Sequence, residues 1–273
     1  MTVRRPYVAG QFYTDDPEAL AREVKDYLRP PGPYEKSAPV RARAVIAPHA
    51  GYMYSGTVAG AIYSVAEVPD DVILIGPNHT GLGQAVSVMT EGSWGLPTGE
   101  VEVNRELAEM VTASSDLFSA DTDAHAREHS LEVQLPFIHA RNPGARIVPI
   151  TVMDADHQAC LEMGSALAGV IRAWDRPVLI AVSSDMNHYE SDEKTREKDK
   201  RAIEKVLDLD DGGLLDTAIA WNISMCGILP AAIAISAARD LGSTSGELVA
   251  YATSAEQSGD YSHVVGYAGI LIR

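Results

Sequence analysis

Four short stretches of almost unbroken apolar residues constrain the fold of this chain more than any other feature. They are residues 42–48, 71–77, 145–152 and 176–184. Each is long enough for a strand, and continuous apolar runs of this kind are typical of parallel strands that helices cover on both faces. Two later stretches, 248–253 and 264–272, have the composition of further strands in the same sheet.

Stretches with helical patterns separate these strands. They are predicted at about 17–28, 56–66, 104–114, 131–140, 156–174, 194–207 and 229–241. The stretch 156–174 places apolar residues on one stripe, and Asp156 is suited to cap its start. The charge-dense segment 190–206 is expected to form a solvated helix face. This alternation predicts an α/β fold in a single domain over 1–273, with a central, mostly parallel or mixed sheet flanked by helices.

Composition excludes several classes of function. The formal net charge of the 273 residues is -16, with a pI near 4.8, whereas nucleic acids and anionic membranes require a basic face. The sequence shows no apolar stretch of 18 residues and no apolar leader near its start. The two cysteines, Cys160 and Cys226, are too far apart for a disulfide framework. We therefore expect a cytoplasmic protein with no nucleic-acid or membrane partner. The composition leaves the oligomeric state open, and a homo-oligomer formed through a less charged helix face is compatible with it.

Histidines follow several of the predicted strands at the point where each strand ends. His49 follows the first strand and His79 follows the second. The fourth strand is followed by residues 183–188, which include Asp185 and His188. Ligands of open α/β sheets bind outside the carboxyl ends of the strands, so these side chains are expected to converge. Each histidine alone is also typical of an ordinary turn. Together they are typical of a transition-metal site, which needs neutral imidazoles near a carboxylate or thiolate.

Cys226 is a candidate for the anionic ligand. It precedes the predicted helix 229–241, and a helix N-terminus stabilises a thiolate. A buried, inert cysteine fits the same spacing, as it does for Cys160. The spacing leaves both interpretations of Cys226 open.

The stretch HAREH, residues 125–129, matches an inverted zinc-peptidase pattern. That pattern requires both histidines on one helical face, but the residues before it are polar and the apolar periodicity begins only after Ser130. A peptidase site is therefore not expected here. His129 is expected to line the cleft, next to a helix N-terminus that suits anions. No local signal accompanies His139, His157 or His263, which are expected to be surface or turn residues.

Several stretches together resemble the Memo-like proteins. They are AGQFYT, APHAGYMYSG, GPNHTG, EHSLEVQLPF, SSDMNHY and MCGILPAAIA. The resemblance implies a fold similar to that of the class III extradiol dioxygenases, non-haem iron enzymes that open catechol rings. It also implies His49, His79 and Cys226 as metal ligands, and His188 as the proton-transfer residue with Asp185 close by.

The chain departs from the dioxygenase pattern because it offers a thiol where those enzymes have a carboxylate. A thiolate favours copper or zinc relative to metals that prefer hard ligands, and a shared fold does not transfer a reaction. Phe12, in the opening stretch, is expected to form either a pocket wall or part of the core.

These observations predict a metal-dependent redox enzyme of the dioxygenase type. Fe(II), with Cu or Zn as alternatives, would bind His49, His79 and Cys226, while His188, Asp185 and His129 would act on a small or phenolic substrate. One alternative is a non-catalytic adaptor that binds a small acid or an anionic peptide in the same pocket. A lesser alternative is a hydrolase with Cys226 as nucleophile and His188 as base.

Overall fold

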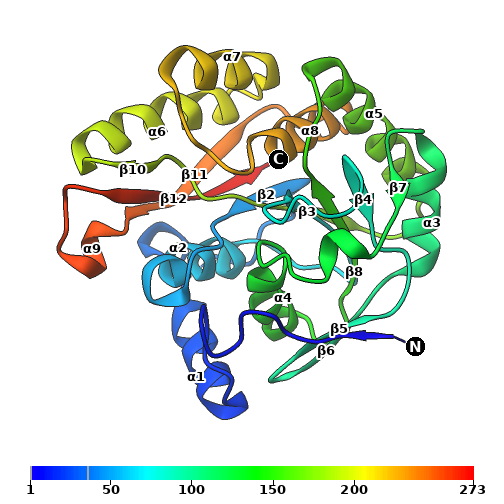
Figure 1. The fold of residues 1–273 in the computed structure, drawn as a ribbon, viewed down its shortest axis with the longest axis horizontal. Helices are drawn as coiled ribbons and strands as arrows, with labels where there is room; N and C mark the ends of the chain where they lie inside the picture. Colours follow the sequence, from blue (N-terminus) through cyan, green and yellow to red (C-terminus); the bar gives the residue numbers. More distant parts are fainter. Residues whose placement is uncertain (1, 36) are drawn as a thin grey trace.

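The computed structural model describes residues 2–35 and 37–273, which form a mixed β-sheet between two layers of helices (Figure 1). Four neighbouring parallel strands make up the middle of the sheet, and all four were predicted from their apolar composition. They are, in spatial order, β2 (Ala44–Ala47), β9 (Val178–Ser183), β3 (Asp71–Pro77) and β8 (Arg146–Val152). The predicted α/β class and the mixed sheet flanked by helices are confirmed.

Antiparallel strands extend the sheet on both sides. Beyond β2 lie β12 (Val264–Ile272) and β11 (Gly246–Thr253), and β10 (His188–Glu190) pairs with the start of β12. Beyond β8 lie β4 (Val86–Val88) and β7 (Ser119–Ala120). A small separate sheet contains β1 (Val3–Arg4), β5 (Ser93–Leu96) and β6 (Gly99–Glu102). The strands of two to four residues outside the middle of the sheet were not predicted, because so few residues show no periodicity.

Helices cover both faces of the sheet (Figure 1). One layer contains α3 (Arg105–Ser114), α5 (His157–Ala173), α6 (Asp192–Leu207), α7 (Asp211–Trp221) and α8 (Ile228–Asp240). The other contains α1 (Pro17–Tyr27), α2 (Tyr52–Val65) and α4 (Leu135–Arg141). Short helical turns complete the chain: η1 (Gly32–Tyr34), η2 (Asp123–His125), η3 (Glu132–Gln134) and α9 (Ala255–Ser258).

The helix starts follow from local chemistry. The Asp156 carboxylate accepts the backbone N–H of Ala159 at 2.8 Å and caps α5, as predicted. Helix α2 begins four residues earlier than expected, at Tyr52, with Gly51 as its N-cap residue. Helix α7 was missed, since Gly212 and Gly213 near its start lower the helix propensity of that segment.

The charged segment 190–206 forms α6 and is only partly a solvated face. Glu193 and Glu197 are exposed as predicted, but the same helix buries Lys198 and Asp199. Charge density alone did not distinguish the two sides of this helix.

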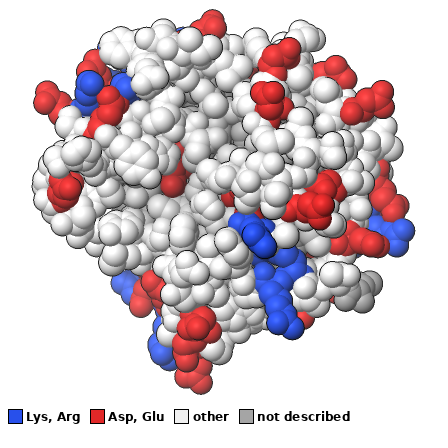
Figure 2. Space-filling model, in the orientation of Figure 1, with Lys and Arg blue, Asp and Glu red and all other residues white. Residues whose placement is uncertain are grey.

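The surface reflects the acidic composition. Figure 2 shows charged side chains mainly toward the rim of the face seen in Figure 1, whereas its hollowed middle carries few of them.

Among the described residues, no helix combines the length and the apolar composition that crossing a membrane would require.

Candidate metal centre

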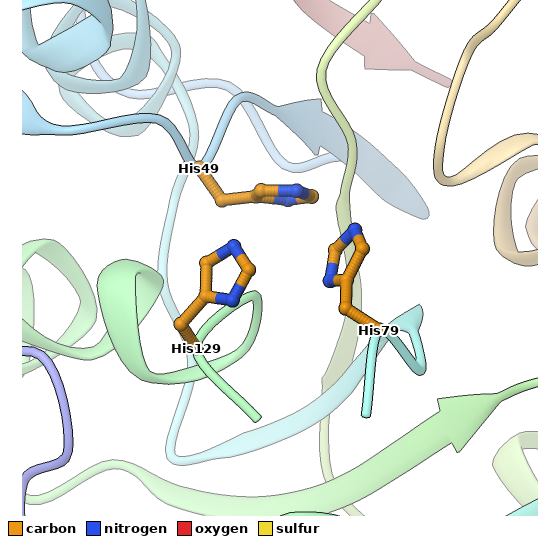
Figure 3. Close-up of side chains that lie close together, drawn as sticks. All are labelled: His49, His79 and His129. Atoms are coloured by element: carbon orange, nitrogen blue, oxygen red, sulfur yellow. The ribbon is translucent and has the colours of Figure 1, made fainter. Parts of the chain in front are cut away.

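Three histidines meet at the carboxyl edge of the parallel strands (Figure 3). His49 follows β2, His79 follows β3, and His129 lies in the loop before η3. One ring nitrogen of each lies within 4.8 Å of the corresponding nitrogens of the other two. The histidines converge because β2 and β3 flank β9 in the sheet, so their ends are two strands apart.

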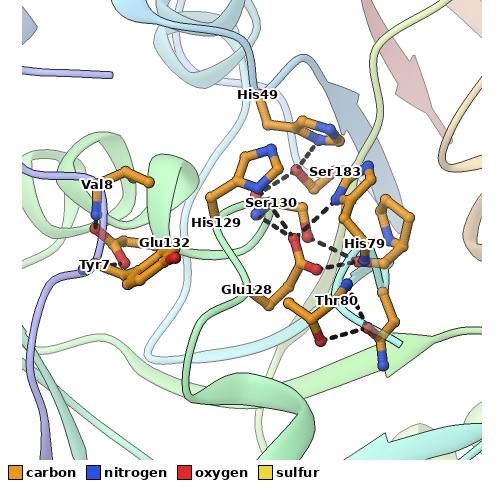
Figure 4. A network of polar contacts seen from close by, with 12 residues as sticks. Tyr7, Val8, His49, His79, Thr80, Glu128, His129, Ser130, Glu132 and Ser183 are labelled. Atoms are coloured by element: carbon orange, nitrogen blue, oxygen red, sulfur yellow. Dashed lines mark hydrogen bonds and ion pairs between the residues drawn. The ribbon is translucent and has the colours of Figure 1, made fainter. Parts of the chain in front are cut away.

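A hydrogen bond to Ser183 determines which nitrogen of His49 is free. The Ser183 hydroxyl donates its single proton to the carbonyl of Ser130 at 2.6 Å and accepts from Gln134 Nε2 at 2.8 Å. It also contacts His49 Nδ1 at 2.9 Å (Figure 4). Because the hydroxyl proton is already used, His49 Nδ1 must donate. The lone pair of His49 Nε2 is therefore available to a ligand.

Glu128 fixes His79 in the same way. Its buried carboxylate accepts from His79 Nδ1 at 2.9 Å, from the His79 backbone N–H at 2.5 Å and from the Ser130 N–H at 2.8 Å (Figure 4). Burial alone would raise the pKa of Glu128, but the hydrogen bonds from His79 and Ser130 lower it to about 2. An ionised carboxylate behind a histidine fixes its tautomer and raises its basicity as a metal ligand.

His129 completes the group. Its ring stacks on that of His79, with centroids 4.7 Å apart and an interplanar angle of 22°. The ring of Phe12 packs against His129 with centroids 4.9 Å apart, so the half-buried Phe12 borders the site.

The surroundings keep His49 and His129 neutral. Burial lowers the pKa of His49 well below its ordinary value, and the nearby His129 and His79 lower it further. Burial also lowers the pKa of His129. Neutral imidazoles are the form that coordinates metals.

Cys226 lies beside His49, just before α8. Its Sγ is 3.3 Å from His49 Nε2, and the backbone N–H of Asp185 points at it from 3.3 Å. Sulfur and nitrogen atoms that share a tetrahedral metal are about 3.5 Å apart. Burial raises the pKa of the Cys226 thiol, and the Asp185 carboxylate raises it further. The sulfur would therefore need a nearby cation to ionise.

Asp185 holds the loop that carries His49. Its Oδ1 accepts the backbone N–H groups of His49 at 2.7 Å and Ala50 at 3.3 Å. Burial raises the pKa of Asp185, although the His49 hydrogen bond opposes the shift. The hydrogen bonds make Asp185 a positioning residue in this structure.

His188 begins β10 and is half-buried. Its Nδ1 lies 2.9 Å from the carbonyl oxygen of Ser224, which can only accept, so Nδ1 carries a proton. Its backbone N–H donates to the Ser224 hydroxyl at 2.8 Å. Nε2 is thus the free nitrogen of this ring.

Comparison with known proteins identifies the family. The family model described as "Memo-like protein" matches residues 4–271. The chain belongs to the Memo family. A MEMO1 family protein of Methanopyrus kandleri is 42% identical over 279 residues and covers 99% of both chains, and one of Aquifex aeolicus is 42% identical over 273 residues with the same coverage.

A solved structure shares the fold of this Memo protein. It is an uncharacterized protein of Escherichia coli K12, which matches 85% of this chain and 100% of its own with a TM-score of 0.53. The sequence identity is 10%, so the likeness concerns the fold alone.

Of the six site residues expected in this Memo protein, the structure brings His49, His79 and His129 into one group. It places Cys226 and Asp185 in contact with His49, and His188 at the start of β10. The family resemblance implied Cys226 as the third ligand, whereas the tightest group in the structure contains His129. His125, the first histidine of HAREH, ends η2 and packs edge-on against Trp94 instead.

The supporting residues were missed. These are Glu128 and Ser130, which precede η3, and Gln134, which ends it, and all three side chains are fully buried. Glu128 stands beside His129 in HAREH, so the motif contained a signal for it. The sequence contained no signal for Gln134, because its role depends on distant residues. Its side-chain amide donates to the Pro48 carbonyl, 86 positions earlier, and to the Ser183 hydroxyl, 49 positions later.

Proposed function

We propose that His49, His79 and His129 bind one transition-metal ion, and that this Memo protein is a non-haem, metal-dependent oxidoreductase of the dioxygenase type. The observation that carries the proposal is the hydrogen bonding of two histidines, which fixes their protons on Nδ1 and leaves the lone pair of each ring on Nε2. Two unrelated side chains, Ser183 and Glu128, impose the same tautomer.

The donor set fits a metal that accepts imidazole nitrogen. Iron, copper and zinc all do so, and the family's resemblance to extradiol dioxygenases favours Fe(II), with copper or zinc as alternatives. When bound, Fe(II) would supply a redox-active Lewis acid with coordination positions left open for a substrate.

Cys226 and His129 are the two candidates for the third ligand. The sulfur lies at a suitable distance from His49, and the His129 nitrogen lies within reach of both other rings. A neutral set with His129 suits Fe(II), while a thiolate from Cys226 would favour copper or zinc. Replacement of each residue separately distinguishes the two.

The chain's own residues would bind and orient the substrate. His188, with its proton on Nδ1, would accept a substrate proton at Nε2. Asp185 would hold the loop of His49 in place, and Phe12 would form one wall of the site beside His129.

The ligand we propose is a small molecule; an anionic peptide bound without turnover is the alternative. The hydrolase gains no support, since the nearest imidazole to the Cys226 sulfur is His49 and not the proposed base His188.

The experiment is metal analysis of protein purified without oxygen. We expect about one metal ion per chain in the native protein and almost none in a His49→Ala, His79→Ala double variant. His129→Ala and Cys226→Ala, measured separately, show which residue is the third ligand. Spectroscopy on the same samples identifies the metal and any bond to sulfur.

The matched control is His263→Ala, which removes an exposed histidine outside the group and should leave the metal content unchanged. Equal metal content in the native protein and the double variant would contradict the proposal. Unchanged thermal unfolding of the apo variants excludes misfolding as the cause of metal loss.

A further inference from the structure

Tyr189 has a backbone conformation that tyrosine rarely adopts. Its φ is 61°, in the left-handed region, which costs a residue with a Cβ free energy. Its side chain is 74% exposed, so burial of the ring does not offset the cost. Strained backbone of this kind persists where the surroundings impose it, and it concentrates at binding sites.

A β-bulge imposes this conformation. His188 pairs with Val265 and Glu190 pairs with Val264, and the register shifts between these two bridges. Tyr189 is therefore the extra residue of the bulge. Bulges re-aim side chains and are frequent beside active sites.

Both neighbours of Tyr189 are firmly held. The His188 backbone N–H donates to Ser224, and Glu190 forms ion pairs with Lys198 at 2.5 Å and Lys194 at 3.0 Å. The Asn187 side-chain amide also donates to Glu190 at 2.9 Å. The chain thus cannot relax at Tyr189 without breaking these contacts.

The bulge places the Tyr189 ring beside that of His188, with centroids 5.6 Å apart. Both rings line a cavity of about 380 Å³, together with Asn187, Glu190, Asn222 and Ser224. The Lys198 and Lys194 ammonium groups already compensate Glu190, and the Lys198 hydrogen bond helps to lower the pKa of Glu190 to about 2. The walls of the cavity therefore offer polar edges and aromatic faces, with no uncompensated carboxylate.

We propose that Tyr189 is a substrate-contact residue that stacks on a flat, uncharged ring bound in the cavity next to His188. This inference rests on the proposed function, because it gives His188 its substrate class. Tyrosine is suited to the role, since it presents a large rigid surface with only two side-chain torsions. A ring stacked on Tyr189 would place its polar substituent near the free Nε2 of His188.

The test compares the binding of phenol with that of cyclohexanol, a non-planar molecule of similar size, by ligand-observed NMR on metal-free protein. We expect saturable phenol binding to the native protein and to Tyr189→Phe, which keeps the stacking surface. Tyr189→Gly should bind phenol about two- to tenfold more weakly. Cyclohexanol should bind weakly to all three.

Tyr189→Gly is also the folding control, because glycine adopts the left-handed conformation without strain. Its melting temperature should equal or exceed that of the native protein, and that of Tyr189→Ala should be lower than that of Tyr189→Gly. Tyr261→Ala removes an exposed tyrosine outside the cavity lining and should leave phenol binding unchanged.

Phenol affinity that is equal in the native protein and Tyr189→Gly, or absent in both, would overturn this inference. Neither result touches the proposed metal site, whose test is metal content. Conversely, if the histidines are shown to bind no metal, the phenol measurement still tests the role of Tyr189, because it uses metal-free protein.

Discussion

Ser130 links the supports of two of the clustered histidines. Its backbone N–H donates to Glu128, which holds His79, and its carbonyl accepts from Ser183, which holds His49. Its hydroxyl donates to the Pro77 carbonyl at the end of β3, at 3.0 Å. The tautomers of the two histidines therefore depend on one buried residue between them, and each histidine is oriented before any metal arrives.

Replacement of Glu128 by glutamine tests this orientation. In Glu128→Gln the side-chain amide would keep an acceptor for His79 Nδ1 but lose the charge that raises its basicity, so metal affinity should fall about 10- to 100-fold. Competition with a chelator of known affinity measures the change. Glu100→Gln, whose carboxylate bonds only to the Ser93 hydroxyl among the described residues, should leave the affinity unchanged. An affinity that does not change in Glu128→Gln would show that the carboxylate has no role in metal binding.

At the scale of elements, α5 and α8 pack closely because of Gly164. A Cβ built on Gly164 would lie 2.5 Å from Ser236 Cβ and 2.9 Å from the Ile233 carbonyl oxygen, both on α8. Helix α8 in turn packs on β2, β3 and β9, the strands that lead to the site. The approach of these two helices thus contributes to the position of the strand ends.

Gly164→Ala should destabilise the protein by about 1–3 kcal/mol, because the backbone of α8 would have to move away. Gly169→Ala, on the exposed side of the same helix with no atom within 4 Å of the added Cβ, should instead stabilise it by about 0.5–1 kcal/mol. Urea unfolding of the two variants measures both effects. Changes of the same sign would contradict the packing argument.

At the scale of the whole molecule, Asp199 joins α6 to strand β11 and to the loop before β10. Its carboxylate accepts the backbone N–H of Asn187 at 2.9 Å and the hydroxyl of Tyr251 in β11 at 2.7 Å. Burial raises the pKa of Asp199 from 3.8 to about 7, against the opposing effects of these hydrogen bonds and of Arg196 and Lys198. The folded chain therefore holds a proton on Asp199 that the unfolded chain releases near pH 4.

This proton makes the stability of the fold depend on pH. The contribution of Asp199 is fully present below about pH 4 and is lost as the pH rises toward 7, at up to about 1.4 kcal/mol per pH unit. In Asp199→Asn the oxygen can still accept from Asn187, and the amide can donate to Tyr251, without titrating. The free energy of unfolding of the native protein should therefore fall relative to that of Asp199→Asn between pH 4 and 7. Parallel pH profiles would exclude a raised pKa at Asp199.

Much of the fold was predictable because it depends on local patterns. The apolar runs predicted β2, β3, β8 and β9, and the helix caps and stripes predicted helices such as α5. The short strands were not predicted, because two to four residues are too few to show a period. Helix α7 was not predicted, because two glycines near its start lower its helix propensity. In each of these cases tertiary pairing or packing outweighs local propensity.

The sequence alone determined that His49, His79 and 183–188 follow strands of one covered sheet, because the composition of a doubly covered strand is visible in the strand itself. Only the tertiary structure decided that β9 lies between β2 and β3, that His129 joins the group and that Glu128 and Ser183 orient the rings. Strand order and side-chain hydrogen bonds join residues some 50 to 130 positions apart, and no local period records such contacts.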